Sequence, residues 1–594
     1  MNNNTNNHRR PNHRFHNKNH NSQHFNNNGK SRINFFALGG QDERGKNCYV
    51  LEINDNIFII NFGALIPTTS LLGVKQLIPD FSWLIKNKNR IKGLFIGYPT
   101  QDNLGSLEYL LKDIGPIPIY TSVIGKSLIE TIAEKKIQNI SIKSLKIIVL
   151  DNLKPINISG QKVIPFRVSS SMPSSLGFAF HTPNGYVLYI DDFVLSSDKN
   201  LAFEGNLNDI SSIVGNNVLA LAVGIGYVNK NSGFTSPKHK SKEILDQIIN
   251  NANPDGRIFV SCYDSNAYTI LTVAQLAKQK SRPLIIYSHT FINIFSTIVR
   301  NKIFNNRNLV TLPISEIDKT NNALICIASN PHRLYSRLSK IANGEDEKIH
   351  FNDKDTFVLI TPRVAGYEGV EAKILDDIAR NDVDYIKLTN DVLPMQASNE
   401  DHKYLLNLLK PKYVMPISGL YKDFVNYATI AKHVGFTSEQ IKILYNGEVL
   451  KFVDGTLQKD ISEISLESRY VDSSGIQDID ASILFEREQM AENGVAIVLV
   501  FYDQKNHKFK PTIKCELYGI SDEEDKLNVI KTKIDEQVNN LFKNLQDVKT
   551  NQKEKNISVS EMRDFKLILK KTVTKIFEKN LDKRPIVLPT VIDL

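Results

Sequence analysis

The chain has 594 residues, of which 41% are hydrophobic and 23% are charged, and this composition is typical of globular proteins. Because the chain is too long for a single hydrophobic core, we expect three or more domains. It contains no run of about 18 uncharged apolar residues and does not begin with an apolar segment, so we expect neither a membrane span nor a secretory signal. Its four widely spaced cysteines form no CxxC pair, which argues against a disulfide framework or a structural zinc site and predicts a cytoplasmic protein.

Residues 1–33 form a basic, low-complexity tail. Residues 1–31 include twelve Asn and five His, and residues 1–33 hold six Lys or Arg and no acid, whereas the net charge of the whole chain is only +9. Such a segment buries too little surface to offset its ordering entropy, so we expect it to be disordered. We interpret its histidines as solvated rather than as metal ligands, and its charge would add salt-sensitive, non-specific affinity for RNA.

Residues 34–210 alternate strands, turns and helices, which is the pattern of a layered α/β domain. The segments "NCYVLEI" and "NIFIINFGAL" are predicted to be strands joined by the turn "NDN", and "SLLGVKQLI" is predicted to be a helix. The predicted strand "GYVLYIDDFV", residues 185–194, ends in two acids.

A second α/β stretch, residues 211–372, contains the strands "VLALAVGIGYV", "GRIFVSCYD", "PLIIYS" and "ALICIAS" with helices between them, which predicts parallel βαβ units. Residues 456–470 are polar and are predicted to be a linker. The C-terminal part has the strand "GVAIVLVFY" and two long helices. The second helix carries an apolar stripe at helical spacing, which is either core or a subunit interface and comprises Met562, Phe565, Leu569, Val573 and Ile576.

The stretch "GLFIGYPTQDNLGSLEYLLKD", residues 93–113, places a polar turn between a predicted strand and a predicted helix. Metal hydrolases often hold their ligands at such a strand end. The turn from Tyr98 to Asn103 is therefore open to three interpretations: a metal site, a former metal site or an ordinary turn.

Several motifs follow one another along the chain, and each is weak alone. They are "ALGGQDERGKN" (37–47), "LIPDF" (77–81), "KGLFIGYPTQDNLG" (92–105), "RVSSSMPSSLG" (167–177), "HTPNGYVLYIDDF" (181–193), "LSKIANG" (338–344), "LLNLLKPKYVMPISGLYK" (405–422), "YVDSSGIQDID" (470–480) and "KNLDKRPIVLPTVIDL" (579–594). Together they resemble the ribonuclease J family, from the β-CASP branch of the metallo-β-lactamase fold. The resemblance runs from about residue 34 to Leu594.

The resemblance implies an α/β architecture in which a metallo-β-lactamase-type αββα sandwich is interrupted by a β-CASP α/β domain and followed by a small C-terminal α/β domain. The corresponding expected segments are residues 34–210 and 373–455 for the sandwich, 211–372 for the β-CASP domain and 471–594 for the C-terminal domain. The resemblance also implies a chemistry. Active members hold two zinc or manganese ions in a cluster of His and Asp, activate water with them and cut RNA hydrolytically.

This chain departs from the family at most of the ligand positions that the resemblance implies. The His-x-His-x-Asp-His loop falls on Tyr98, Thr100, Asp102 and Asn103, so that only the Asp is kept. Two further His ligands fall on Ser170 and Ser418, while the bridging Asp is kept as Asp192. The His that helps to handle the scissile phosphate falls on Gln396, and an acid of the inserted domain falls on Ile225.

Two of seven expected ligands therefore survive, and we expect no metal cofactor and no functional catalytic residue. Asp102 and Asp192 are interpreted as turn and strand-end acids that bond neighbouring amides, with one weak Mg²⁺ or Mn²⁺ held by both as the alternative. The histidines outside the tail agree, because no two are close enough in sequence to form a His-x-His or His-x3-His pair. They are His181, His239, His289, His332, His350, His402, His433 and His507.

We predict a ribonuclease J-like protein of RNA maturation and decay that lacks catalysis and acts as an RNA-binding, regulatory subunit. Its partners would be RNA and, in a homo- or hetero-oligomer, an active ribonuclease J. Candidate RNA contacts between the sandwich and the β-CASP domain are Arg167, Lys230, Lys238, Lys240, Arg333 and Arg363. One alternative is an active 5′-to-3′ exoribonuclease or endoribonuclease with a divergent metal site; another is a structural protein that reuses the fold without RNA.

Overall fold

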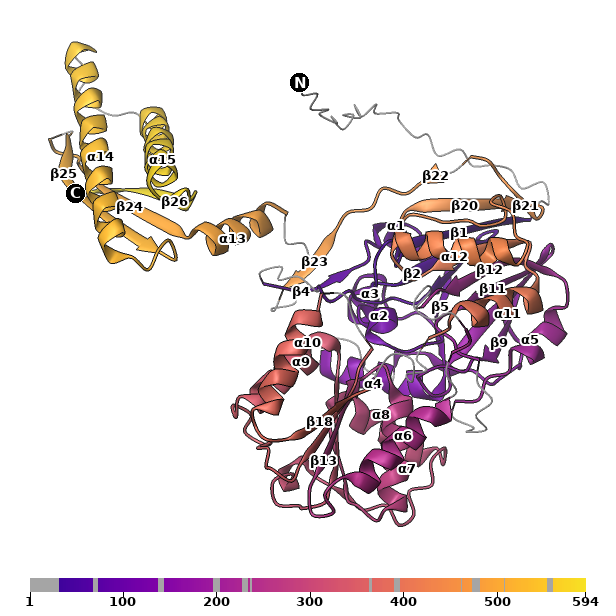
Figure 1. Cartoon of the computed structure of the whole chain (residues 1–594). Helices are drawn as coiled ribbons and strands as arrows, with labels where there is room; N and C mark the ends of the chain where they lie inside the picture. Colours follow the sequence, from indigo (N-terminus) through magenta and orange to yellow (C-terminus); the bar gives the residue numbers. More distant parts are fainter. Residues whose placement is uncertain are drawn as a thin grey trace, which may run out of the picture.

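The computed structural model describes residues 31–67, 73–136, 144–195, 203–226, 233–235, 238–362, 366–388, 396–460, 462–472, 481–506, 508–552 and 559–594. Figure 1 shows a sandwich domain, an inserted domain beside it and a C-terminal domain at the end of a connecting helix. Residues 1–30 of the predicted disordered tail and the candidates Lys230 and Arg363 lie outside the described residues. Residues 31–33 of that tail are described, and strand β1 begins at Arg32.

The sandwich domain begins with a nine-stranded sheet. Its strands β2 and β3 form the predicted hairpin, whose turn residue Asn54 has a φ of 53°, a conformation that Asn tolerates better than most residues. The strands are β1 (Arg32–Gly39), β2 (Cys48–Ile53), β3 (Asn56–Ile60), β5 (Ile91–Ile96), β6 (Ile119–Thr121), β7 (Ile147–Val149), β20 (Glu448–Val453), β21 (Thr456–Leu457) and β22 (Ser462–Glu463).

A six-stranded sheet faces the first and closes the sandwich. Aromatic side chains fill the space between the sheets: the ring of Phe95 on the first lies 5.1 Å from that of Phe178 and 5.2 Å from that of Phe180 on the second. The strands of the second sheet are β8 (Ile156–Ile158), β9 (Gln161–Arg167), β10 (Leu176–Thr182), β11 (Gly185–Ile190), β12 (Val218–Gly224) and β19 (Tyr413–Ile417).

Helices cover the outer face of each sheet, so the predicted αββα arrangement is confirmed. The first sheet is covered by α1 (Ser82–Lys86), α3 (Leu107–Ile114) and α4 (Val123–Lys136). The second is covered by α5 (Leu207–Val214), α11 (Asn399–Leu409) and α12 (Tyr421–His433). The amphipathic α3 ends at Gly115, whose φ of 91° is accessible to glycine at low cost.

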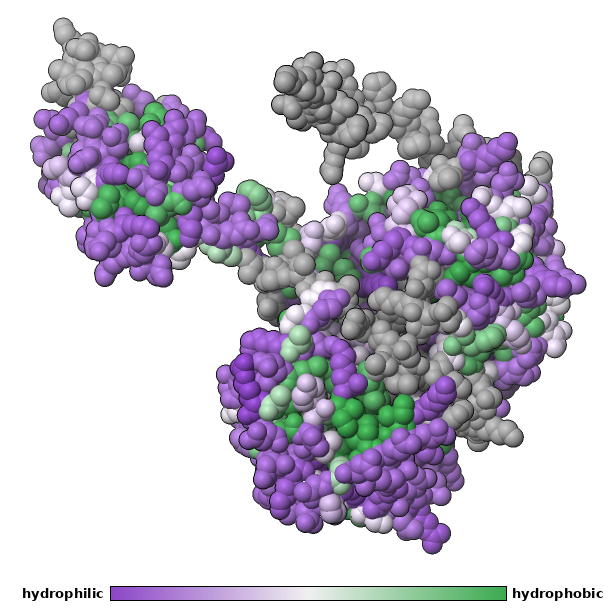
Figure 2. All heavy atoms as spheres, viewed as in Figure 1, coloured by the Kyte–Doolittle hydropathy of each residue, from purple (hydrophilic) through white to green (hydrophobic). Residues whose placement is uncertain are grey.

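The inserted domain is a six-stranded parallel sheet with helices on both faces, which confirms the predicted βαβ units. The strand order is β15-β14-β16-β13-β17-β18. The strands are β13 (Ile258–Tyr263), β14 (Leu284–Tyr287), β15 (Thr311–Leu312), β16 (Leu324–Ser329), β17 (Thr356–Ile360) and β18 (Asp384–Lys387); the helices are α6 (Lys238–Asn251), α7 (Ala267–Gln279), α8 (His289–Arg300), α9 (Pro331–Ala342) and α10 (Glu368–Ala379). Figure 2 shows hydrophobic residues between its two helix layers. Tyr385 on β18 is 47% exposed.

The insertion begins later and ends later than residues 211–372. Strand β12 pairs with β11 and β19 and so belongs to the sandwich, whereas β18 pairs with β17 and so belongs to the inserted domain. Every residue of β12 is buried, and a wholly apolar strand has no alternation that would assign it to one sheet or another.

Two other local predictions differ from the structure. The helix predicted around residues 70–78 is strand β4 (Val74–Ile78), which pairs antiparallel with β23 (Arg469–Asp472), almost 400 residues away in sequence. The predicted linker, residues 456–470, contains β21 and β22, both of which pair with β20. Pairing with a strand far away in sequence determines the structure of β4, and local periodicity does not report such pairing. Residues 456–463 instead pair with the neighbouring β20, beginning with a hairpin in which Val453 faces Thr456.

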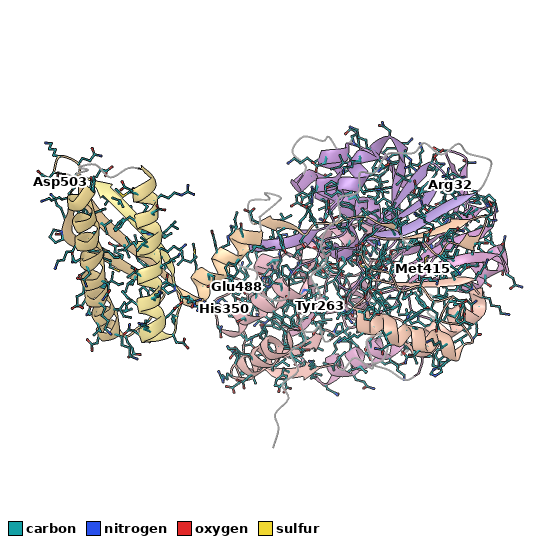
Figure 3. All side chains as sticks on the ribbon, turned by 90° about the horizontal axis from the view of Figure 1, so that it is seen from above. Arg32, Tyr263, His350, Met415, Glu488 and Asp503 are labelled. Carbon is teal, nitrogen blue, oxygen red and sulfur yellow. The ribbon has the colours of Figure 1, made fainter. Side chains whose placement is uncertain are left out.

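The C-terminal domain is a three-stranded sheet, ordered β25-β24-β26, with two long helices on one face. The predicted apolar stripe packs into this core, where Phe565 contacts Phe509 and Phe542. Figure 3 shows the domain, marked by Asp503, apart from the other two and joined to them by α13 with Glu488. Its elements are α13 (Ala481–Asn493), β24 (Val495–Asp503), β25 (Lys508–Tyr518), α14 (Glu524–Gln552), α15 (Val559–Leu581) and β26 (Ile586–Asp593).

Among the described residues, the helices are each too short or too polar to cross a membrane.

Candidate functional site

Tyr98 links the sandwich domain to the inserted domain. It follows β5, is 6% exposed, and its hydroxyl lies 2.7 Å from Ser171 Oγ. Ser171 Oγ donates to the carbonyl of Ser265, which follows β13, and the Ser171 carbonyl accepts from the amide of Tyr268. Burial, together with the charge of Asp192, raises the pKa of Tyr98 well above its usual range, so the hydroxyl stays protonated and donates to Ser171.

The other residues of the turn from Tyr98 to Asn103 also contact the surrounding protein. The buried Asn103 accepts from Asn47 Nδ2 at 2.7 Å and donates to the Tyr98 carbonyl at 2.7 Å. Thr100 is half-buried and precedes α2 (Gln101–Leu104). A Cβ at Gly63 would lie 1.5 Å from the Asp102 carbonyl oxygen, so only glycine admits the loop at this distance.

The two serines at ligand positions have protein partners. Ser170 is fully buried, with its hydroxyl 2.7 Å from that of Ser175. Ser418 follows β19 with a φ of 61°, and its amide donates to Tyr49 Oη at 3.0 Å and to the Gly40 carbonyl at 3.1 Å. Hydrogen bonds with neighbouring residues therefore fix the positions of Ser170 after β9 and of Ser418 after β19.

Four carboxylates lie near the junction between the two domains. Asp102 comes from α2, Asp191 and Asp192 follow β11, and Asp264 follows β13 of the inserted domain. Asp191 is 5% exposed and accepts from Tyr189 Oη at 2.7 Å and Asn61 Nδ2 at 3.0 Å. Asp264 was not singled out from the sequence; the acid at the end of the apolar run "GRIFVSCYD" was the available signal.

These carboxylates hold protons unusually tightly. Desolvation by neighbouring groups, assisted by the charges of Asp192 and Asp264, raises the pKa of Asp102, and solvent limits this shift because the residue is exposed. Burial likewise raises the pKa of Asp191 to about 7 and of Asp192 and Asp264 to about 6. The charges of Arg44 and Arg333 oppose the shifts of Asp192 and Asp264, respectively. Near neutral pH the group is therefore partly protonated.

Gln396, the residue to which the resemblance assigns the position of the phosphate-handling His, contacts Asp192. Its Nε2 donates to Asp192 Oδ2 at 2.8 Å. Arg44, which also influences Asp192, is paired at 2.8 Å with Asp423 of α12. An amide that donates to a carboxylate fixes that carboxylate but supplies no general acid or base at ordinary pH.

The residues at this junction do not fit a two-metal centre. Five of the seven positions implied by the resemblance carry side chains other than His or carboxylate, and Tyr98, Asn103 and Ser170 are engaged in hydrogen bonds with the protein. Within the described ranges, no three His, Cys, Asp or Glu side chains converge as a metal group requires.

The candidate RNA contacts in the described part of the chain come from different elements. Arg333 lies in the first turn of α9, is exposed, and influences Asp264. Arg167 ends β9 and Lys240 is exposed on α6. Lys238 begins α6, but its side chain lies outside the described residues.

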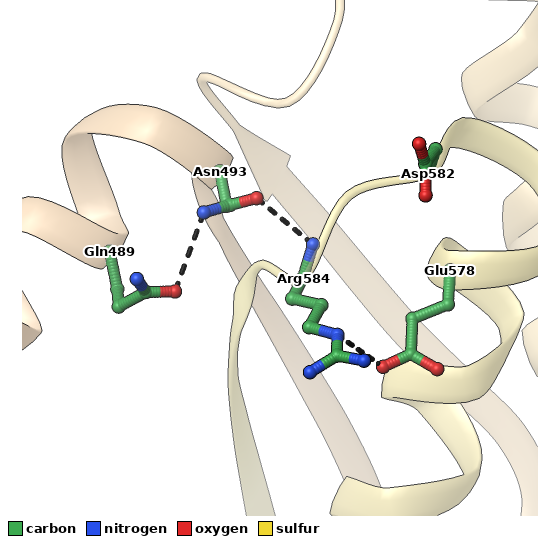
Figure 4. A pocket seen from close by; sticks show the side chains of 5 residues that line it. All are labelled: Gln489, Asn493, Glu578, Asp582 and Arg584. Carbon is green, nitrogen blue, oxygen red and sulfur yellow. Dashed lines mark hydrogen bonds and ion pairs between the residues drawn. The ribbon is translucent and has the colours of Figure 1, made fainter. Parts of the chain in front are cut away.

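A polar pocket in the C-terminal domain is separate from this site (Figure 4). Arg584 Nε pairs with Glu578 Oε1 at 2.7 Å, and the Arg584 amide donates to Asn493 Oδ1 at 3.0 Å. Gln489 and Asp582 complete the lining. These interactions join α13, α15 and the start of β26.

Replacing Tyr98 by phenylalanine should loosen the contact between the two domains. The change removes the donor to Ser171 and keeps the ring, so we expect a loss of about 1 kcal/mol in the free energy of unfolding and faster amide exchange at Tyr268. Tyr385→Phe is the matched control, because Tyr385 is 47% exposed on β18. Equal effects of the two substitutions would contradict a linking role for Tyr98.

Known proteins resemble this chain in sequence. The family model for the ribonuclease J β-CASP domain matches residues 255–378, and that for the ribonuclease J C-terminal domain matches residues 482–594. An uncharacterized protein of Mycoplasma genitalium is 48% identical over 95% of this chain and 100% of its own length. Ribonuclease J2 of Bacillus subtilis is 26% identical over 80% of this chain and 85% of its own length.

A solved structure, of a protein of unknown function from Enterococcus faecalis, covers 72% of this chain and 100% of its own, with 13% identity and a TM-score of 0.48. The two family models fall on the inserted and C-terminal domains seen here, and the relatives span nearly the whole chain. The chain belongs to the ribonuclease J family.

Proposed function

We propose that this chain is a non-catalytic ribonuclease J that binds RNA and regulates an active ribonuclease J. Membership of the family supports a role in RNA processing. The observation that carries the proposal is the engagement of Tyr98, which stands at a His ligand position and connects through Ser171 to the inserted domain. A side chain committed to this contact supplies no ligand to a metal ion.

The carboxylates favour one alternative, an active ribonuclease with a divergent metal site. The charges of Asp192 and Asp264 both act on Asp102, and carboxylates are the ligands that Mg²⁺ and Mn²⁺ prefer. The proposal and this alternative differ in one measurable property, metal-dependent cleavage that requires Asp192.

Incubation of the purified chain with a 5′-monophosphorylated RNA should give no more cleavage than the Asp192→Ala variant gives. Mn²⁺, Mg²⁺ and Zn²⁺ are supplied in turn, and Asp151→Ala, which removes an acid that is 69% exposed, is the matched control. We expect all three proteins to be equally inactive. Cleavage by the unaltered chain and by the Asp151 variant, abolished in the Asp192 variant, would establish the divergent enzyme instead.

The regulatory part of the proposal needs a binding measurement. Fluorescence anisotropy of the same RNA should show binding that weakens as salt rises, because phosphate contacts release counterions. The chain is then added to an active ribonuclease J, and the rate of RNA cleavage is followed. A changed rate or position of cleavage supports the regulatory role; unchanged cleavage and no association would refute it.

A further inference from the structure

Residues 233–235 carry an exposed phenylalanine where the chain enters the inserted domain. Phe234 is 64% exposed, more than any other large hydrophobic side chain among the described residues, and no hydrophobic cluster of those residues includes it. The segment lies between β12, a strand of the sandwich, and α6, the first helix of the inserted domain. Phe234 therefore stands on one of the two chain crossings between the domains.

The crossing that returns to the sandwich holds both neighbours of this phenylalanine. The Thr235 amide donates to Asp401 Oδ2 at 3.2 Å, and Thr235 Oγ1 accepts from the Ser398 amide at 3.2 Å. On the other side, Ser398 Oγ donates to the carbonyl of Gly233. Asp401 is fully buried and also accepts from the Ser398 amide at 2.9 Å. A backbone that is already fixed on both sides loses little conformational freedom when its side chain binds a ligand.

The same hydrogen bonds connect this segment to the candidate site. Thr235 Oγ1 lies 3.0 Å from the carbonyl oxygen of Gln396, whose Nε2 donates to Asp192. A Cβ at Gly226, just after β12, would lie 2.9 Å from Gln396 Cβ, so the outgoing crossing packs closely against this residue as well. Phe234 is therefore one residue away from a direct contact with the glutamine that binds Asp192.

A single aromatic ring between small polar neighbours suits the face of a nucleobase. Proteins bind single-stranded RNA largely by stacking its bases on aromatic side chains, and every base has a face that can stack. An apolar protein partner would need a wider apolar surface, whereas Gly233 and Thr235 offer none beside the ring. Lys240 is exposed on α6, six residues further along the chain, and is already a candidate phosphate contact.

We propose that the ring of Phe234 stacks on a base of single-stranded RNA at the domain junction. The inference rests on the proposed binding of RNA and adds an uncharged contact to it. Stacking on a phenylalanine reads no base edge, so the contact tolerates any sequence. It also differs from the lysine and arginine contacts in its response to salt, because stacking releases no counterions.

The first test is fluorescence anisotropy of a labelled, unstructured RNA, with EDTA present so that cleavage cannot consume the probe. Phe234→Ala should weaken binding at least about fivefold, the lower end of the effect of removing one stacked base. The dependence of affinity on salt should not change. Phe485→Ala is the matched control, because Phe485 is 61% exposed on α13, and it should bind RNA like the unaltered chain. Thermal unfolding verifies that both variants fold.

The second test detects the stacked base directly. The chain has one tryptophan, Trp83 of α1, so Phe234→Trp adds a single new fluorophore. We expect this variant to bind RNA at least as tightly as the unaltered chain and to lose fluorescence when RNA is added, because the base stacks on the introduced ring. An abasic nucleotide at one position of the RNA should weaken binding to the unaltered chain and leave binding to the Phe234→Ala variant unchanged.

The results that overturn the inference are distinct from those that overturn the proposed function. Equal affinities of the unaltered chain and Phe234→Ala, or a Phe234→Trp variant whose fluorescence RNA leaves unchanged, would refute stacking while RNA binding stands. A chain without affinity for RNA would refute both. If Phe234→Ala instead abolishes association with an active ribonuclease J and leaves RNA binding unaltered, the ring contacts a protein and the inference is wrong.

Discussion

Arg257→Ala is expected to cost about 3–5 kcal/mol of the free energy of unfolding of the inserted domain, the largest loss predicted for this chain. Arg257 precedes β13 and holds Asp355 through two hydrogen bonds, from Nε at 3.0 Å and from Nη2 at 2.6 Å. The arginine side chain is 5% exposed and that of Asp355 is wholly buried. Without the guanidinium, the carboxylate remains buried and lacks its charged partner, which costs more than the pair itself contributes.

Arg380→Ala is the matched control for this prediction. Arg380 also contacts two carboxylates, Asp376 at 2.6 Å and Asp377 at 3.3 Å, but its side chain is 71% exposed. Exposed pairs contribute about 0–1 kcal/mol, so this variant should unfold almost like the unaltered chain. The measurement is amide exchange of β13 and β17 during urea unfolding, which reports on the inserted domain alone. Similar losses for the two arginines would show that burial does not decide the effect.

Relative to the unaltered chain, the Asp191→Asn variant should become more stable as the pH rises. Burial raises the pKa of Asp191 to about 7, so the folded protein keeps a proton that the unfolded chain releases above its ordinary pKa of 3.8. Stability from this group is complete below about pH 4 and is lost as the pH rises through about 7. Between about pH 5 and about pH 8, the unaltered chain should therefore lose up to about 3 kcal/mol relative to the variant.

Urea unfolding at both pH values tests this sign directly. Asp151→Asn is the control, because it removes an acid whose side chain is 69% exposed. A pH-independent difference between Asp191→Asn and the unaltered chain would show that Asp191 ionises in the folded protein as readily as in the unfolded chain. An Asp191 variant that is less stable at high pH would reverse the predicted sign.

The layers and the parallel βαβ units could be predicted from the sequence, because motif order and local periodicity report them. The boundary of the insertion could not, since β12 is apolar throughout and pairs with strands on both sides. The helix predicted over "SLLGVKQLI" is β4, because its partner β23 lies at the far end of the chain. In each case a partner distant in sequence decides the structure.

The residues of the candidate site likewise include some that the sequence could predict and some that it could not. The resemblance located Tyr98, Asp102, Asp192 and Gln396 by their motifs, and the last three lie at the domain junction with Tyr98 beside them. What the sequence did not reveal was Asp264, which the inserted domain brings to Asp102 from 162 positions further along the chain. The contact between Tyr98 and Ser171 was likewise hidden, because two hydroxyls that are 73 residues apart carry no joint signal.

The hydrogen bond of Tyr98 makes a histidine at this position costly to acquire by a single mutation. A Tyr98→His mutation alone removes the link to Ser171, yet Thr100, Asn103, Ser170 and Ser418 still stand where ligands would be needed. The cost is immediate, whereas any gain in metal affinity requires several further substitutions. Selection acting on one mutation at a time would thus retain the tyrosine.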